Sequence, residues 1–221
     1  MHSSQDEQDS RFYGKFALIP TFEPSSQQEA YDMMAAAFSY SEQQKLPVLM
    51  RVTTRMAHSR AVVSVKDQPD EENPLNYNAE AGSWVLLPAN ARRRNEAVCR
   101  QQATLEADAE KSLFNAWHEG SDHSLGLLTS GIGFNYVMEC FPQGCPYPVL
   151  KIGQYPLPKQ LVRRLYDECD SLLVVEEGQP FIEDMVRGII PTGKYLESFL
   201  RNLILGERNE MRNRYLHVDY P

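Results

Sequence analysis

The sequence predicts an α/β protein in which a partial α/β unit is followed by a doubly wound, mostly parallel sheet. After residue 124, apolar runs and amphipathic stretches alternate three times with short connections, which is typical of such a sheet. Before residue 60 the chain offers one strand–helix–strand unit, and a polar, proline-bearing stretch separates the two regions. Hydrophobic residues make up 42% of the chain and charged residues 24%, as in ordinary globular domains.

The first unit begins with a short apolar run, Phe16 to Ile19, which Pro20 stops and which we expect to be a buried strand. A helix follows, capped by Ser25 or Ser26 and running to about residue 45. Its apolar face at helical spacing is formed by Ala30, Met33, Met34, Ala37, Phe38 and Ser41. Residues 48–53 then form a buried strand. One such unit leaves long unpaired sheet edges, so it looks like the back half of a domain.

The middle of the chain is less regular. Residues 61–65 could add one strand, and residues 66–82 form an acidic linker with few apolar residues. Residues 91–119 are expected to form one long surface helix that Gly120 ends, with the basic run at 91–94 on a solvated face.

The second region carries the clearest pattern. Strands are predicted at 124–130, 147–153 and 171–177, and helices at 131–141, 159–169 and 179–189. Residues 194–205 could form a final amphipathic helix, and no prediction is made for the rest of the tail.

The turn that contains Gly131 and Gly133 invites comparison with a dinucleotide-binding loop. That fingerprint needs a third glycine, whose place is taken here by Tyr136, and an acidic residue after the second strand, which is absent. We therefore interpret the turn as a tight strand-to-helix connection, and a small nucleotide-binding Rossmann protein remains a weaker alternative.

Charged residues at two strand ends are candidate functional groups. Glu176 and Glu177 lie at the carboxyl end of a predicted strand, where ligands bind in open parallel sheets. A helix cap or a salt bridge at a subunit contact is the preferred interpretation, because no catalytic partner is near in sequence. Arg55, His58 and Arg60 follow another strand and could bind an anion, although a lone histidine is more often a surface residue.

Several classes of function are disfavoured. The net charge of −8 argues against nucleic-acid binding. No apolar run is long enough to cross a membrane, and the polar N-terminus is not a signal peptide, so a cytoplasmic location is expected. The four cysteines have no metal-binding spacing and are interpreted as buried free thiols, so no metal site is predicted.

Several segments together resemble the alpha (large) subunit of indolepyruvate:ferredoxin oxidoreductase. The most specific is HSSQ-x-EQDSR at residues 2–11, followed by EPS-x-QQEAYDM. The segments LPVLMRVTTRMAHSR, WVLLPANARRR, LLTSGIGFNYV, LKIGQYPLP and VVEEGQPFIE follow in the same order, over about residues 1–190.

The resemblance implies oxidative decarboxylation of 2-oxoacids, here arylpyruvates, to acyl-CoA. The complete enzyme would use thiamine diphosphate with magnesium, coenzyme A and iron–sulfur clusters, and would pass electrons to ferredoxin. Residues 1–65 resemble the end of the pyrimidine-binding domain, and residues 83–190 resemble the C-terminal domain of transketolase. Residues 66–82 link the two, and residues 191–221, a helix and a polar tail, have no counterpart.

By the same resemblance, the polar loop at the N-terminus lies near cofactor and substrate in the assembled enzyme. The residues implied are His2, Ser3, Ser4, Gln5, Glu7 and Arg11. Arg55 and His58 are second candidates, and no catalytic role is assigned to any of them.

The family's diphosphate-binding and cluster-binding regions have no match here, and Met1 resembles an internal methionine of a longer sequence. We therefore expect a subunit fragment that is inactive alone, binds no cofactor tightly by itself, and works with the remaining segments or subunits in a homo- or hetero-oligomer. The alternative is a short non-catalytic interaction or assembly module of the same complex.

Overall fold

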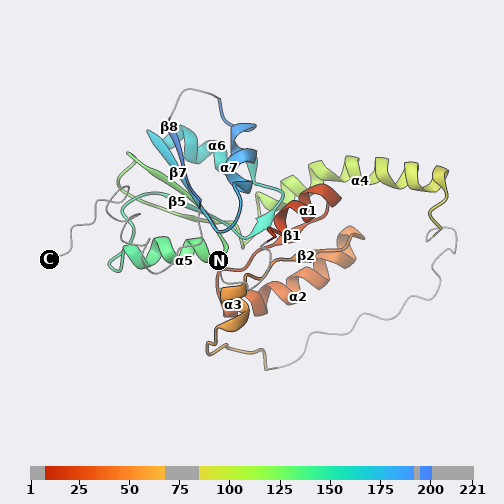
Figure 1. The fold of residues 1–221 in the computed structure, drawn as a ribbon, viewed down its shortest axis with the longest axis horizontal. Helices are drawn as coiled ribbons and strands as arrows, with labels where there is room; N and C mark the ends of the chain where they lie inside the picture. Colours follow the sequence, from red (N-terminus) through yellow and green to blue (C-terminus); the bar gives the residue numbers. More distant parts are fainter. Residues whose placement is uncertain (1–7, 68–84, 192–194, 201–221) are drawn as a thin grey trace.

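The computed structural model describes residues 8–67, 85–191 and 195–200, which form two sheets with helices around them (Figure 1). The first sheet has the order β2-β1-β6 and the second the order β3-β5-β4-β7-β8. The strands of the first sheet are β1 (Thr21–Phe22), β2 (Leu49–Met50) and β6 (Gln154–Tyr155). Those of the second are β3 (Ala116–His118), β4 (Gly126–Ser130), β5 (Val149–Ile152), β7 (Ser171–Glu176) and β8 (Tyr195–Leu200). The predicted α/β class is confirmed.

The second sheet is doubly wound, as the alternating pattern predicted. Strands β5, β4, β7 and β8 run parallel, and among the described strands of this sheet β3 alone is antiparallel to its neighbour. Helix α5 (Gly131–Cys140) packs Val137 against Leu127 and Val175 on one face. Helices α6 (Lys159–Glu168) and α7 (Phe181–Arg187) cover the other face. Successive strand residues therefore enter opposite cores, which explains why β4 and β7 are apolar almost throughout.

The first region differs from its prediction at its start. Residues 16–19 are not a strand, because they lie at the end of helix α1 (Arg11–Ala17), where Phe16 is 89% exposed. Leu18, with a φ of 58°, ends this helix in a left-handed conformation before β1 begins at Thr21. The apolar run was misread because its largest side chain faces outward.

Helix α2 (Gln27–Gln44) starts where the sequence predicted. Its N-cap is Ser26, whose hydroxyl accepts a hydrogen bond from the Glu29 amide, while the Glu29 carboxylate accepts one from the Ser25 amide. Met33 and Ala37 are buried, but Met34 and Phe38 on the predicted apolar face are 48% and 70% exposed. The helix therefore packs on a narrower stripe than its sequence suggests.

Four further expectations are corrected. Strand β2 is shorter than predicted, because Thr53 already caps helix α3 (Thr54–His58). Residues 61–65 form no strand. Helix α4 (Pro88–Ala109) ends before the predicted Gly120, since the chain turns into β3 to pair with β5. Residues 195–200 form β8 rather than a helix, through pairing with β7. Residues 201–205 of that expected helix and 68–82 of the linker lie outside the described residues.

The unpaired edge expected of the first unit is covered by the second region. Strand β6 pairs antiparallel with β1, so the three-stranded sheet combines strands from both regions. Phe114 packs against the small core around Phe22 and Met33, and the Asn115 amide donates a hydrogen bond to the carbonyl oxygen of Gln154. The two regions are thus joined by backbone pairing as well as side-chain packing.

The cysteine prediction holds except at one position. Cys140 and Cys169 are buried free thiols and Cys145 is partly buried, whereas Cys99 is exposed on α4. Within the described part of the chain, no helix has the length and apolar character needed to cross a membrane.

Candidate functional site

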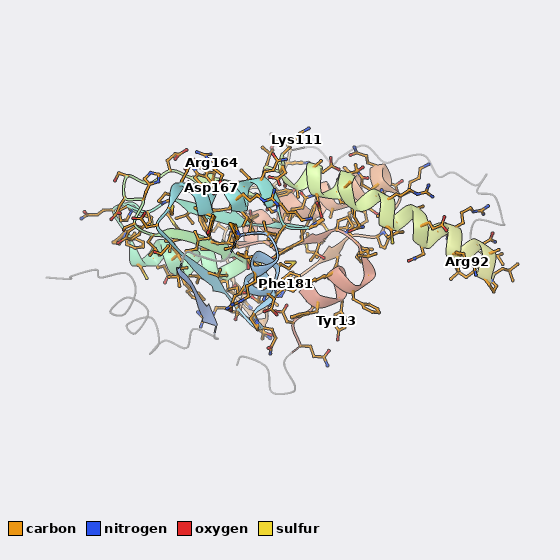
Figure 2. The ribbon with its side chains drawn as sticks, turned by 90° about the horizontal axis from the view of Figure 1, so that it is seen from above. Tyr13, Arg92, Lys111, Arg164, Asp167 and Phe181 are labelled. Carbon is orange, nitrogen blue, oxygen red and sulfur yellow. The ribbon has the colours of Figure 1, made fainter. Side chains whose placement is uncertain are left out.

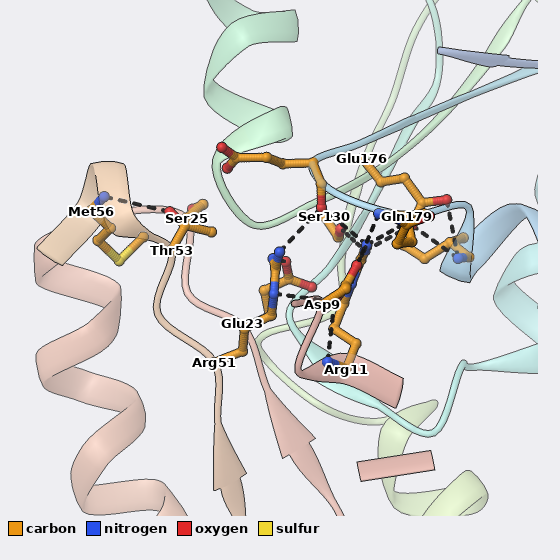
Figure 3. A network of polar contacts seen from close by, with 12 residues as sticks. Asp9, Arg11, Glu23, Ser25, Arg51, Thr53, Met56, Ser130, Glu176 and Gln179 are labelled. Carbon is orange, nitrogen blue, oxygen red and sulfur yellow. Dashed lines mark hydrogen bonds and ion pairs between the residues drawn. The ribbon is translucent and has the colours of Figure 1, made fainter. Parts of the chain in front are cut away.

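A buried ionic cluster lies where the carboxyl ends of β1, β2, β4 and β7 approach one another (Figure 3). We call it the junction cluster and define it as Asp9, Arg11, Glu23, Arg51 and Glu176. Each of these side chains is at least nine-tenths buried. Because unpaired charges are costly in such surroundings, their mutual contacts decide what the cluster can do.

Arg11 is the centre of the junction cluster and is fully buried. Its Nη1 lies 2.7 Å from Glu176 Oε2, and its Nε donates to Asp9 Oδ1 at 2.9 Å. Its Nη2 pairs with the same aspartate and donates to the carbonyl oxygens of Glu177 at 3.0 Å and Gln179 at 3.1 Å. The guanidinium therefore ties the N-terminal segment to the loop after β7.

Arg51 makes the second set of bonds. Its Nη1 is ion-paired with Glu23, and its Nε lies 3.5 Å from Asp9 Oδ1. Its Nη2 donates a hydrogen bond to the carbonyl oxygen of Glu177 at 3.1 Å. Glu23 also accepts a hydrogen bond of 2.6 Å from the Tyr155 hydroxyl on β6. Both arginines thus hold the same loop, one from the start of α1 and one from the position after β2.

The ionisation of the cluster follows from burial and from these partners. Burial by itself would raise the pKa of Asp9, but the hydrogen bonds and charge of Arg11 and the charge of Arg51 lower it below its usual value. Burial raises the pKa of Glu176 despite the nearby Arg11. Burial and the charge of Glu23 raise the pKa of Tyr155, so this phenol stays protonated and donates to Glu23.

Glu176 acts as a helix cap, which was the preferred interpretation of the acidic pair. Its carboxylate accepts hydrogen bonds from the amides of Ile182 at 3.0 Å and Glu183 at 3.2 Å, at the start of α7. Its ion pair is with Arg11 of the same chain. The described contacts of Glu176 are therefore structural.

The turn between β4 and α5 is likewise structural. Gly131 has a φ of 48°, and a Cβ added there would lie 2.7 Å from Glu23 Oε1. A Cβ at Gly133 would lie 2.9 Å from the carbonyl oxygen of Val175. The first glycine permits the backbone angle and the second permits close packing of helix on strand, so the interpretation as a tight turn is confirmed.

A second group of polar side chains surrounds α3. Thr54, Arg55, His58 and Ser59 line an open surface depression of about 310 Å³. The Arg55 guanidinium lies over the ring of Tyr136, 5.2 Å from its centroid. Neither Arg55 nor His58 has an ion pair with any carboxylate that the structure describes, so both side chains keep hydrogen-bond donors that an anion can use.

Several proteins named as a subunit of indolepyruvate oxidoreductase are similar to most of this chain. It is 38% identical over 192 residues to indolepyruvate oxidoreductase subunit IorA of Methanothermobacter thermautotrophicus, and 35% identical to that of Archaeoglobus fulgidus. Each alignment covers 86% of this chain and 31% of the relative. IorA of Thermococcus kodakarensis is 34% identical over 196 residues, covering 85% of this chain and 30% of that one. No protein-family model matches.

The chain is homologous to a segment of IorA. It spans about a third of the length of these relatives. The fold agrees with that of a 2-oxoglutarate:ferredoxin oxidoreductase from Magnetococcus marinus, with a TM-score of 0.56 and 12% identity. That match covers 88% of this chain and 42% of the other. The resemblance found in the sequence is thereby confirmed.

The residues predicted from the IorA resemblance fall into three places. His2, Ser3, Ser4, Gln5 and Glu7 lie outside the described residues. Arg11 lies in the junction cluster, and Arg55 and His58 lie at the depression beside α3. The structure does not show these groups as one site.

The prediction missed most of the junction cluster. Asp9, Glu23 and Arg51 were not singled out, although Glu23 and Arg51 directly follow the strands β1 and β2. The sequence pattern places Arg51 inside a predicted strand at 48–53 and Glu23 four residues beyond a predicted strand at 16–19, so neither is marked as a strand-end residue. Arg11 and Glu176 are 165 residues apart in the chain, so no local sequence pattern indicates that they pair.

Proposed function

We propose that this chain is a segment of the alpha subunit of a thiamine diphosphate-dependent indolepyruvate:ferredoxin oxidoreductase. The complete enzyme would convert arylpyruvates to acyl-CoA and pass electrons to ferredoxin, in the cytoplasm and as a multi-subunit assembly. Homology to IorA over 86% of the chain carries this proposal. The proposed substrate and the subunit assignment come from the names of the relatives. The proposed cofactors come from the resemblance of the sequence motifs.

The described residues do not by themselves fit the cofactors of such an enzyme. Asp9, Glu23 and Glu176 are each ion-paired with a buried arginine, so a magnesium ion would have to displace that arginine. In the described ranges, no three His, Cys, Asp or Glu side chains come together as a metal site. We therefore derive no chemical step through a cofactor and assign the chain a positioning role.

The positioning role centres on Arg11. Residues 2–7, which the resemblance places near cofactor and substrate, precede Asp9 directly in the chain. Asp9 and Arg11 are fixed to the carboxyl ends of β2 and β7 through Arg51 and Glu176. We propose that the junction cluster holds this polar loop at the sheet edges where ligands bind in open α/β folds. Arg11 is then a positioning residue and touches no reacting atom.

Arg55 and His58 have a different proposed role. They lie at an open depression and have no described carboxylate partner, so they can bind a negatively charged group of a ligand. A carboxylate and a phosphate both fit this chemistry.

The proposal is tested in two steps. The chain alone, with thiamine diphosphate, magnesium, indolepyruvate and coenzyme A, should form no acyl-CoA, and robust turnover would sink the segment proposal. In the second step, residues 1–190 replace the matching segment in IorA of Methanothermobacter thermautotrophicus, produced with its partner subunits. This chimera should retain indolepyruvate-dependent reduction of ferredoxin.

The Arg11→Met substitution in the same chimera distinguishes a role of Arg11 in positioning the site from a role in folding alone. We expect a lower kcat in protein that still elutes as the assembled complex. Arg163→Met, on the exposed side of α6, is the matched control and should leave turnover unchanged. A folded, assembled but inactive parent chimera would contradict the assignment to IorA.

A further inference from the structure

The chain that follows helix α3 lies beside α2 without joining either sheet. Side chains of α2 hold this stretch at both ends. The Gln27 side-chain amide donates a hydrogen bond to the Ser59 hydroxyl, and the Tyr31 hydroxyl accepts one of 3.1 Å from the Lys66 backbone amide. Between these anchors lies the sequence AVVSV at residues 61–65, which we call the edge segment. Its sequence predicted a strand, yet it has no strand partner among the described residues.

Gln28 of α2 holds the middle of the edge segment in the geometry of a strand. Its Oε1 accepts a hydrogen bond of 2.8 Å from the Ser64 backbone amide, and its Nε2 donates one of 3.2 Å to the Ser64 carbonyl oxygen. In a β-ladder, a residue likewise directs its N–H and its C=O to the same side, towards the neighbouring strand. Lys66, two residues further on, also directs its amide towards α2. This alternation with a period of two is the pattern of an extended strand.

The edge segment is open on the side that faces away from α2. Because backbone groups alternate along an extended strand, the N–H and C=O groups of Ala61, Val63 and Val65 point to this side. None of these three residues has a hydrogen bond to another residue in the described ranges. Val62 is fully exposed and Val65 is 69% exposed. Three valines in five residues favour a strand, so the segment combines strand-forming residues with an unpaired backbone edge.

The open edge and its charges determine which kind of partner fits. An unpaired strand edge binds an extended backbone, whose N–H and C=O groups complete the ladder. The two ends of the segment differ in charge. Arg60, at the first end, is exposed and has no carboxylate partner that the structure describes, whereas the charges of Lys66 and Asp67 at the other end cancel. A matching strand should therefore carry a carboxylate beside Arg60.

We propose that the edge segment is a docking edge for an extended segment of a partner protein, which adds to it as a β-strand and places an acidic residue beside Arg60. The two hydrogen bonds from Gln28 fix the strand geometry before the partner binds, which reduces the conformational entropy lost on binding. The valines then pair with a strand that the partner supplies. The proposal is independent of the cofactors and of the reaction assigned above.

A synthetic peptide, acetyl-EVTVTVE-amide, tests the docking edge, because it has alternating β-branched residues and a carboxylate at each end. In NMR titrations of the isotope-labelled chain, we expect saturable binding with a Kd below about 1 mM. The amide proton signals of Val63 and Val65 should move downfield, and that of Ser64 should move least because it is already bonded to Gln28. The same peptide with N-methylated central amides keeps every side chain and should bind at least about tenfold more weakly.

Two neighbouring proline substitutions show whether the outward side of the edge segment is used. Val63→Pro removes an outward N–H and should raise the Kd of the peptide at least about tenfold. Val62→Pro places the same ring at the adjacent position, whose N–H points to the α2 side, and is the matched control that should change the Kd by less than about twofold. Circular dichroism and thermal unfolding confirm that both variants keep the fold, which is expected because the segment joins neither sheet.

Charge reversal tests the acidic residue of the partner. Arg60→Glu should raise the Kd of the peptide at least about threefold, whereas Arg92→Glu, near the outer end of α4 and away from α3 (Figures 1 and 2), should leave it unchanged. Absence of binding at about 1 mM peptide, equal binding of the N-methylated peptide, or equal losses in the paired variants would overturn the proposal. Self-association of the chain that Val63→Pro abolishes would assign the edge to a second copy and would overturn it as well.

Discussion

Arg11 and Arg55 were both marked as candidates from sequence, yet their surroundings in the fold are opposite. Arg11 is fully buried, and its guanidinium contacts two carboxylates and two carbonyl oxygens. Arg55 lies at an open depression over the ring of Tyr136, with no described ion pair. A guanidinium whose donors are already used holds the architecture together, whereas one without a carboxylate can still bind a ligand.

The comparison also separates two meanings of a functional residue. The junction cluster joins α1, β1, β2 and β7, so changes there should alter the stability of the fold. Arg55 and His58 belong to no buried ionic network that the structure describes, so changes of these two side chains should alter ligand binding more than stability.

The largest effect is expected at Arg11. Arg11→Met should lower the free energy of unfolding by roughly 3–5 kcal/mol, because it leaves Asp9 and Glu176 buried without their main counter-charge. Urea unfolding followed by circular dichroism measures this loss. Arg163→Met is the exposed control, and a loss at Arg11 no greater than the control's would show that the cluster is not structural.

A smaller, pH-dependent effect is expected at Asp9. Its folded-state pKa lies below its usual value of 3.8, so its stabilisation is present above about pH 3.8 and is lost as the pH falls through the folded pKa. Asp9→Asn removes this titration. The unfolding free energy of the variant should therefore fall less steeply than that of the parent below about pH 4.

Urea unfolding at a series of acid pH values checks the Asp9 prediction. Glu42→Gln, which neutralises an exposed carboxyl, serves as the control. Parallel acid profiles for Asp9→Asn and the parent would show that this aspartate is not selectively stabilised as an anion.

The smallest effect on stability is expected at α3. Arg55→Gln and His58→Gln should each change the unfolding free energy by less than about 0.5 kcal/mol, because these side chains are not part of a buried network. Each substitution should also abolish the chemical-shift changes that inorganic phosphate or indolepyruvate causes in NMR spectra around residue 58. In the Arg55→Gln variant, the signals of the His58 side chain report this loss directly. An unchanged response in both variants would move the anion site elsewhere.

The parts of the fold that follow local rules were predictable. The units β4–α5, β5–α6 and β7–α7 combine apolar runs with short connections, and each appears where the pattern placed it. Two of the errors arose where distant pairing overrides local preference. Residues 116–118 became a strand by pairing with β5, and residues 195–200 did so by pairing with β7.

The candidate site was predictable in part for the same reason. The motif resemblance identified Arg11, and strand-end position identified Glu176, but their contact depends on the packing of α1 against the second sheet. Glu23 and Arg51 become recognisable only when the short strands β1 and β2 are placed side by side. Whether a charged side chain is buried depends on the tertiary structure. The sequence alone shows only the positions of charged residues along the chain.

A double-mutant cycle between Arg11 and Glu176 tests the central claim most directly. Glu176→Gln keeps a hydrogen-bond acceptor for the start of α7 but removes the charge that faces Arg11. With Arg11→Met as the second change, we predict a coupling energy of at least about 1.5 kcal/mol in the free energy of unfolding. Losses that add to within about 0.5 kcal/mol would show that the two residues act independently and would contradict the account.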